Sequence, residues 1–361
     1  MADILPIIKD YFKNVNSILP LFDENAFMAS LDERRIAGGR VPVVHGAVNI
    51  MLALAFQFEV TSHLPTSAVN SAMCISKAES VIDSLNTNQY DLTGLQVLLG
   101  LIVFHLGTPH PGLSTASSLL GRAIKLTHRL RLHRKKTDAL FETNIRLQRA
   151  RVFWIVYTLD RYISSRTHDP PLQQNNDHDI MMPSSVHGAG RVTLTTQSGT
   201  AISLDIFQTW IHLARIQGVI YEQLYSVCAE AQSATIRQRN TKNIYKMLME
   251  WLDTIPKALH PDGLLNVSPK PATVQLLLLH FMHLSCVLQL YRMISDDAEW
   301  ISRLVAYSQR VVEAAGPETV SESSLLSFLK PSSAWPEAVG TARKCAKLFR
   351  LVDMNNSRIK W

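Results

Sequence analysis

Glycine and proline are both scarce in this sequence, at 15 and 16 of 361 residues. Sheets built from many short strands need frequent tight turns, which these two residues supply. Their scarcity therefore favours long helices. Charged residues are also few, at 18%, against 47% hydrophobic residues. This balance excludes a disordered chain and is typical of one that buries a large core.

Cysteine is rarer still, with four residues spread along the chain at Cys74, Cys228, Cys286 and Cys345. None of them forms the Cys-x-x-Cys spacing that zinc sites use. Cysteines so far apart are typical of reduced, buried thiols, which persist in the reducing interior of a cell.

A long uninterrupted apolar run is missing as well. The longest candidates, Val48–Phe58 and Leu276–Leu290, are broken by Asn, Gln and His residues, whereas a membrane span needs about 20 mostly apolar residues. Residues 1–11 lack the basic region and apolar run of a secretion signal. We therefore expect an intracellular protein, cytoplasmic or nuclear, without membrane contact.

Common enzyme signatures are absent from the sequence. It has no Gly-x-Ser-x-Gly elbow, no phosphate-binding loop and no dinucleotide fingerprint. His280, His283 and Cys286 recur every three residues in an apolar segment. Positions i and i+3 share a helical face, but i+6 has rotated away, so three such ligands do not converge on one metal. We expect neither a metal nor a cofactor.

Apolar residues at helical spacing are what the sequence has in abundance. Helices are expected within 1–27 and over 43–60, 67–85, 92–106, 114–132, 145–165, 204–228, 234–255, 272–294, 296–315 and 336–352. Prolines predict an extended segment over 169–183, and 184–203 is predicted to be a loop. Strict alternation of apolar and polar residues never lasts long, so the predicted fold class is all-α, a large multi-helix domain.

The region from Asp91 to Ser184 carries an ordered series of motifs. It contains the apolar helix Leu95–Leu101, the segment Leu120–Leu126, the aromatic helix Arg149–Arg161 and a Pro-rich stretch that ends in Met182-Pro183. This order resembles the middle homology region of fungal zinc-cluster transcription factors, over roughly residues 10–230. The resemblance implies a regulatory helical domain over 1–230, with the helices of 231–361 packed on it.

Two features depart from that family. Members usually carry a six-cysteine zinc cluster upstream, which four scattered cysteines cannot build. The usual Gly-basic-Pro turn is replaced by His168-Asp169-Pro170. We expect that this chain, lacking the cluster, does not read DNA by the family's route.

Charged residues in the region of resemblance have structural interpretations. Asp160 lies in an apolar helix, so it is expected to pair with an arginine, Arg122 or Arg151, because an unpaired buried charge is costly. A basic run alternates with leucines at helical spacing, which is typical of a solvated helix face rather than of a nucleic-acid contact. Its members are Arg122, Lys125, Arg129, Arg131, Arg134, Lys135 and Lys136.

Two functions from different classes follow. The first is a stand-alone regulatory domain that binds a small apolar molecule or a partner, either a full-length regulator or a second copy. The second is a cofactor-independent cyclase, a pericyclase of the Diels–Alderase type, acting on an apolar polyene in fungal secondary metabolism. Holding the substrate in its reactive orientation can by itself lower the activation barrier of such a reaction by ~7–11 kcal/mol. The missing enzyme signatures therefore do not decide between the two functions. A truncated gene product also fits the sequence.

Residues expected to line a ligand cavity are aromatic or polar-tipped side chains within apolar helices. No catalytic residue is assigned. The candidates are Phe104, His105, Trp154, Tyr157, Trp210, Tyr225, His280, His283 and Tyr291.

Overall fold

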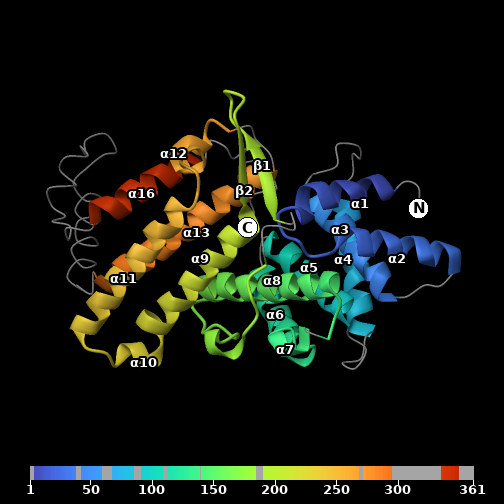
Figure 1. Ribbon diagram of the computed structural model, residues 1–361, viewed down its shortest axis with the longest axis horizontal. Coiled ribbons are helices and arrows are strands. Elements are labelled where there is room, and N and C mark those ends of the chain that lie inside the picture. The colour runs from blue at the N-terminus through green and yellow to red at the C-terminus, as the bar shows by residue number, and fades with distance from the viewer. Residues whose placement is uncertain are drawn as a thin grey trace, which may run out of the picture.

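The computed structural model describes residues 4–37, 42–58, 67–84, 91–108, 112–138, 140–183, 190–267, 271–294 and 335–348. Helices dominate these residues, which confirms the all-α prediction (Figure 1). The larger helices are α1 (Leu5–Tyr11), α2 (Glu24–Ala37), α3 (Pro42–Gln57), α4 (Ser67–Ser84), α5 (Leu92–Leu106), α6 (Gly112–Arg129), α8 (Thr143–Thr167), α9 (Ile206–Ile220), α11 (Ala234–Asp253), α13 (Pro271–Ile294) and α16 (Trp335–Lys347).

Helix α8 runs through the middle of the molecule, between the helices α1–α7 and the group that contains α9, α11, α13 and α16 (Figure 1). Its central residues from Val152 to Ile163 are all buried. It packs against α5 and α6 on one side and α9 on the other. The aromatic helix expected over 145–165 is therefore the element that joins the two halves.

The second half is built around α9, which packs against α11 and α13, while α16 packs on α13 (Figure 1). α9 begins at the cap Asp205, whose carboxylate accepts a hydrogen bond from the Gln208 amide at 2.9 Å. It continues into a π-helical turn, Tyr221–Tyr225, and a one-turn helix α10 (Val227–Glu230). The predicted division of the chain at residue 230 falls just after α10 and stays a prediction.

The prediction of a loop over 184–203 and of no sheet was wrong in part. Strands β1 (Arg191–Thr195) and β2 (Ala201–Asp205) form an antiparallel hairpin. Leu194 and Leu204 are buried, whereas the residue before each of them is exposed and the residue after it is half-buried. The sequence did carry this period-two signal, but only over five residues in each strand, which was too short to distinguish from a loop.

Two other predictions need correction or qualification. Cys228 is exposed, whereas Cys74, Cys286 and Cys345 are buried. Cys228 differs because it lies in the single surface turn of α10. Ala272–Leu290 within α13 is long and apolar enough to cross a membrane by length and composition, and 56% of that window is buried inside the structure. The helix predicted over 296–315 lies outside the described residues.

Candidate ligand-binding site

A pocket of about 560 Å³ lies over the outer face of α9. Its floor consists of His212, Arg215, Ile216 and Val219, which follow one another at the i, i+3, i+4, i+7 spacing of a single helical face. The opposite face of α9 is buried in the core. The sequence of α9 thus places a mixed polar and apolar surface at the bottom of a hollow.

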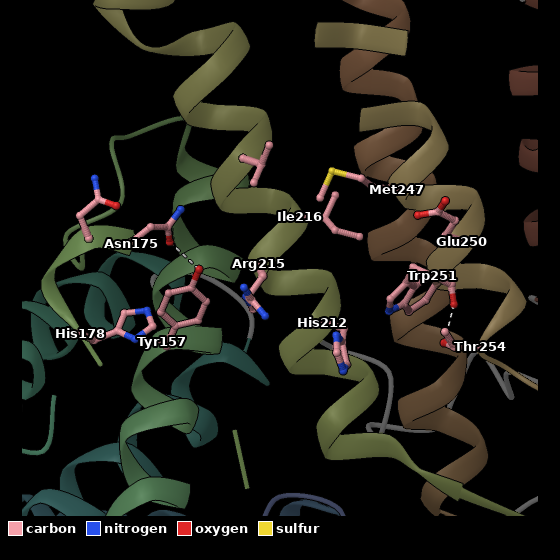
Figure 2. Close-up of a pocket in the computed structure, with 12 residues that line it drawn as sticks. Tyr157, Asn175, His178, His212, Arg215, Ile216, Met247, Glu250, Trp251 and Thr254 are labelled. Atoms are coloured by element: carbon pink, nitrogen blue, oxygen red, sulfur yellow. Dashed lines mark hydrogen bonds between the residues drawn. The ribbon is translucent and has the colours of Figure 1, made fainter. Parts of the chain in front are cut away.

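One wall of this pocket comes from α11 and its C-cap residue, with the same spacing: Met247, Glu250, Trp251 and Thr254 (Figure 2). Trp251 is 3% exposed, and its indole N–H donates a hydrogen bond to the Thr209 carbonyl at 2.9 Å. The ring is therefore fixed against α9, and the other three side chains project from the same face of α11.

The opposite wall consists of Tyr157 on α8 and Asn175, Asn176 and His178 from the extended segment (Figure 2). The Tyr157 hydroxyl donates a hydrogen bond to Asn175 Oδ1 at 2.6 Å. The His178 ring lies against Tyr157, with ring centroids 5.6 Å apart. This wall depends on how the extended segment is fastened to α8.

That fastening is a buried ion pair between Asp160 and Arg161, 2.7 Å apart. The backbone amides of Leu172 and Gln173 each donate to the Asp160 carboxylate at 3.0 Å. Arg161 in turn donates to Asn175 Oδ1 at 2.8 Å. Burial raises the pKa of Asp160, and the Arg161 guanidinium and the two amides oppose that shift.

The predicted partners of Asp160 were therefore wrong. Arg122 lies 3.4 Å from Asp83 instead, and Arg151 donates to Gln148. The neighbouring Arg161 reaches Asp160 because the extended segment folds back over the end of α8 and encloses both side chains. The pairing of Asp160 with an arginine was itself predicted correctly.

Arg215 gives this pocket its positive charge. Its guanidinium lowers the pKa of His178 and of His212, in each case after the larger effect of burial, and it also acts to lower the pKa of Tyr157, which burial raises. Among the described residues, Arg215 makes no ion pair or hydrogen bond. Glu250, the acidic residue of the lining, lies 3.6 Å from Lys246 on the same helix.

Two buried histidines lie on α13, and His283 contacts a residue of the pocket lining. The His283 ring stacks on Trp251, with centroids 5.2 Å apart. His280 is hydrogen-bonded through Nε2 to the Leu259 carbonyl at 2.8 Å. Burial lowers the pKa of each histidine to about 4, so both rings are neutral at pH 7.

The nine residues predicted from the sequence are distributed over several places. Tyr157 lines this pocket, and Tyr225 lines a smaller one of about 120 Å³, where its hydroxyl donates to the Gln289 carbonyl. His283 supports Trp251 from behind. The Tyr291 side chain lies outside the described residues.

The other predicted residues line none of the pockets described here. The Trp154 indole donates to the Met181 carbonyl at 3.0 Å, and Trp210 is 6% exposed within the core. Phe104 and His105 lie on α5, where His105 contacts Glu79 at 3.1 Å. Within the described part of the chain, no group of three His, Cys, Asp or Glu residues is placed to hold a metal.

Arg215, His212 and Asn175 were not singled out from the sequence. One signal could have found the first two, because they are ionisable residues three apart in a mostly apolar helix. Asn175 has no such signal, since its position depends on Arg161 and Tyr157.

Comparison with known proteins assigns a family to this architecture. The sequence model described as "Fungal specific transcription factor domain" matches residues 8–253. The "ABC-transporter-regulating transcription factor" of Aspergillus oryzae is 32% identical over 314 residues, which cover 85% of this chain and 34% of that protein. The protein of the same name in Aspergillus fumigatus is 31% identical over the same shares.

A further relative is the "Fusaridione A cluster transcription factor" of Fusarium heterosporum, 27% identical over 61% of this chain and 42% of its own length. The chain spans about a third of the length of the two Aspergillus relatives. No solved structure matches it.

Proposed function

The chain belongs to the fungal specific transcription factor domain family, and from this premise we propose that it is the part of a transcription regulator that receives a small molecule. Family membership makes it a transcription-regulator-like domain. The proposal adds that a compound bound over α9 changes the regulator's output.

The observation that carries the proposal is the 560 Å³ pocket. Its volume lies within the range of about 300–1,000 Å³ that small-molecule sites occupy. Its walls come from α8, α9, α11 and the extended segment, all of them within the matched region except the last residue, Thr254. A bound molecule would therefore contact several elements of the family domain at once.

The names of the relatives support a more specific version. Two of them are named as regulators of ABC transporters. We propose that this chain contributes to the control of transporter genes, and that it acts in the nucleus as part of, or together with, a regulator that contacts DNA. The exposed basic residues of α6 fit a solvated helix face, so the proposal gives this domain no direct nucleic-acid contact.

The cyclase alternative gains no support from the pocket. Folding a polyene for ring closure requires a site that excludes water and is predominantly apolar. Here the lining includes the exposed, charged side chains of Arg215 and Glu250. The geometry favours reversible binding over that chemistry.

A reporter assay tests the proposal. The 361-residue chain is fused to a heterologous DNA-binding domain in a fungal strain, and reporter transcript is measured while aromatic compounds of different charge are added. Val219→Trp places an indole on the pocket floor, so we expect it to abolish the compound-dependent change while protein level and melting temperature are retained.

The matched control is Val227→Trp, at a position that is 81% exposed and outside the pocket lining. It should respond like the unmodified chain. An unaltered response in Val219→Trp, or no response to any compound in the unmodified chain, would overturn the proposal.

A further inference from the structure

We propose that the pocket over α9 receives a small amphipathic anion, with its carboxylate at Arg215 and a flat apolar body against Trp251. This inference rests on the proposed function, because it names the chemical class of the ligand for the same pocket.

Arg215 is the residue of the lining that favours an anionic group. Its side chain is exposed into the pocket and, among the described residues, has neither an ion pair nor a hydrogen bond. A guanidinium offers a planar set of donors that matches a carboxylate in a bidentate arrangement. Figure 2 shows Arg215 on α9 between Tyr157 and His212, so further polar groups stand beside it.

The surroundings of Arg215 reinforce its charge. Arg161 lies on the Tyr157 side of the pocket, with its guanidinium carbon 4.4 Å from the Tyr157 ring centroid. His178 has a buried Nδ1 without a hydrogen-bond partner in the described structure. The pKa of His178 is lowered mainly by burial, and the charges of Arg215 and Arg161 lower it further, while Asp179 acts against them.

Two acidic groups near this end, Asp205 and Asp179, have partners of their own. Asp205 caps α9 by accepting from the Gln208 amide at 2.9 Å, and Asp179 accepts from the Lys135 amide at 2.6 Å. Glu222 has a smaller effect on the pKa of Tyr157 than Arg161 and Arg215 have. Glu250 projects from α11 on the other side of α9 from Tyr157 (Figure 2). A ligand with a second negative charge at the Glu250 side would be repelled.

The apolar end is formed by Trp251, Met247, Ile216 and Val219. The Trp251 ring is held from behind by the stacked His283 and at its edge by the hydrogen bond to Thr209. A ring fixed in this way loses little conformational freedom when a flat molecule packs on it, and such preorganisation favours binding. Met247 beside it is a flexible side chain that adapts to different shapes.

A charge-matched pair of probes tests the inference on the purified 361-residue protein. 1-Naphthoate and 1-naphthamide share an aromatic body and differ in charge, and their binding is followed by calorimetry and tryptophan fluorescence. We expect the carboxylate to bind about tenfold more tightly, as a hydrogen-bonded charge pair supplies. High salt should weaken the binding of the carboxylate and leave the binding of the amide unchanged, because salt screens charge interactions.

Arg215→Leu should remove the preference for the carboxylate, while Arg146→Leu, at an exposed arginine on α8 outside the pocket lining, should keep it. Because the Arg215 side chain is exposed, both variants should retain the melting temperature of the parent protein. Val219→Trp should block both probes.

The two proposals fail differently in this experiment. Equal affinity for naphthoate and naphthamide, both blocked by Val219→Trp, would overturn the anionic class and leave the ligand-receiving function intact. Persistence of the carboxylate preference in Arg215→Leu would also overturn it. If neither probe binds, the anion inference fails, and the reporter response of Val219→Trp alone decides the proposed function.

Discussion

At the scale of single residues, the pocket wall depends on a buried charge that does not itself line the pocket. Asp160 is fully buried, and it binds Arg161 together with the amides of Leu172 and Gln173. These contacts hold the extended segment on α8. Arg161 then fixes Asn175, which accepts from Tyr157. The pocket-lining side chains of Tyr157 and Asn175 are thus positioned by a buried ion pair about one helical turn beyond Tyr157.

Breaking this ion pair should be costly. Asp160→Asn leaves the Arg161 charge buried without a counter-charge, and such losses cost about 3–5 kcal/mol. We expect urea denaturation to show a decrease of that order in the free energy of unfolding. Arg161→Met should lower the free energy of unfolding by a similar amount. The double variant should lose less than the sum of the two single losses, because neither charge is then left without its partner.

The matched control is Glu250→Gln, which removes an exposed partner of Lys246. Exposed pairs of this kind contribute about 0–1 kcal/mol. If Asp160→Asn cost no more than Glu250→Gln, the buried pair would not be what fastens the segment.

Residue-level prediction from the sequence succeeded where burial alone decides and failed where the choice of partner depends on the path of a loop. That Asp160 needs an arginine follows from its apolar neighbours. Which arginine it meets depends on the path of residues 169–183, and a sequence pattern does not contain that path. Arg215 was missed for a related reason: a single charge on an apolar helix reads as a solvent-facing position until α11 and Asn175 are placed beside it.

At the scale of elements, the crossing of α8 and α9 requires a residue without a side chain. A Cβ at Gly218 would lie 2.9 Å from Arg161 Nε and 3.0 Å from Asn175 Nδ2. Arg161 cannot move away freely, because it is bonded to Asp160, Gln173 and Asn175. The glycine therefore lets α9 approach the buried ion pair and sets the depth of the pocket floor.

Two glycine substitutions test this contact, and we expect them to change the stability of the protein in opposite directions. Gly218→Ala should destabilise the protein by about 1–3 kcal/mol, the usual cost of overpacking. Gly121→Ala, within α6, meets nothing within 4 Å, so it should stabilise by about 0.5–1 kcal/mol through its effect on helix propensity. Thermal and urea denaturation measure both.

Two further results would distinguish the effect of packing at Gly218 from the general effect of alanine on helix propensity. Gly218→Ala should also weaken naphthoate binding, since Asn175 must shift, while Gly121→Ala should not. Should Gly218→Ala instead stabilise the protein as Gly121→Ala does, the close approach of α9 to Arg161 would be wrong.

Long helices were the elements best predicted from the sequence. α5, α8, α11 and α13 each carry an extended apolar pattern, and their observed bounds lie within about two residues of those expected. The hairpin β1–β2 was missed because it is short and its stability depends on packing against α9 and α13. The π-helical turn after α9 was missed too, since nothing in Tyr221–Tyr225 distinguishes it from continued α-helix.

At the scale of the whole molecule, the second half encloses two histidines that the chain must keep neutral. His280 and His283 are 1% and 2% exposed, and they lie where α13 packs against α11 and the segment near Leu259. Each has its pKa lowered to about 4. The unfolded chain takes up these protons near the usual pKa of 6.5, so between pH 6.5 and 4 it binds more protons than the folded chain.

Folding stability should therefore fall as the pH drops through that window. From pH 7 to pH 5 each of these histidines should cost about 2 kcal/mol of unfolding free energy, the value that follows from linkage with pKa values of 6.5 and about 4. Urea titrations at the two pH values measure the change.

His280→Gln isolates one contribution, because its side-chain amide can still donate to the Leu259 carbonyl but does not titrate. We expect this variant to lose about 2 kcal/mol less than the parent protein between pH 7 and pH 5. His45→Gln, at an exposed position on α3, should behave like the parent protein. If His280→Gln and the parent protein lost the same stability, the buried ring would not be neutral in the fold.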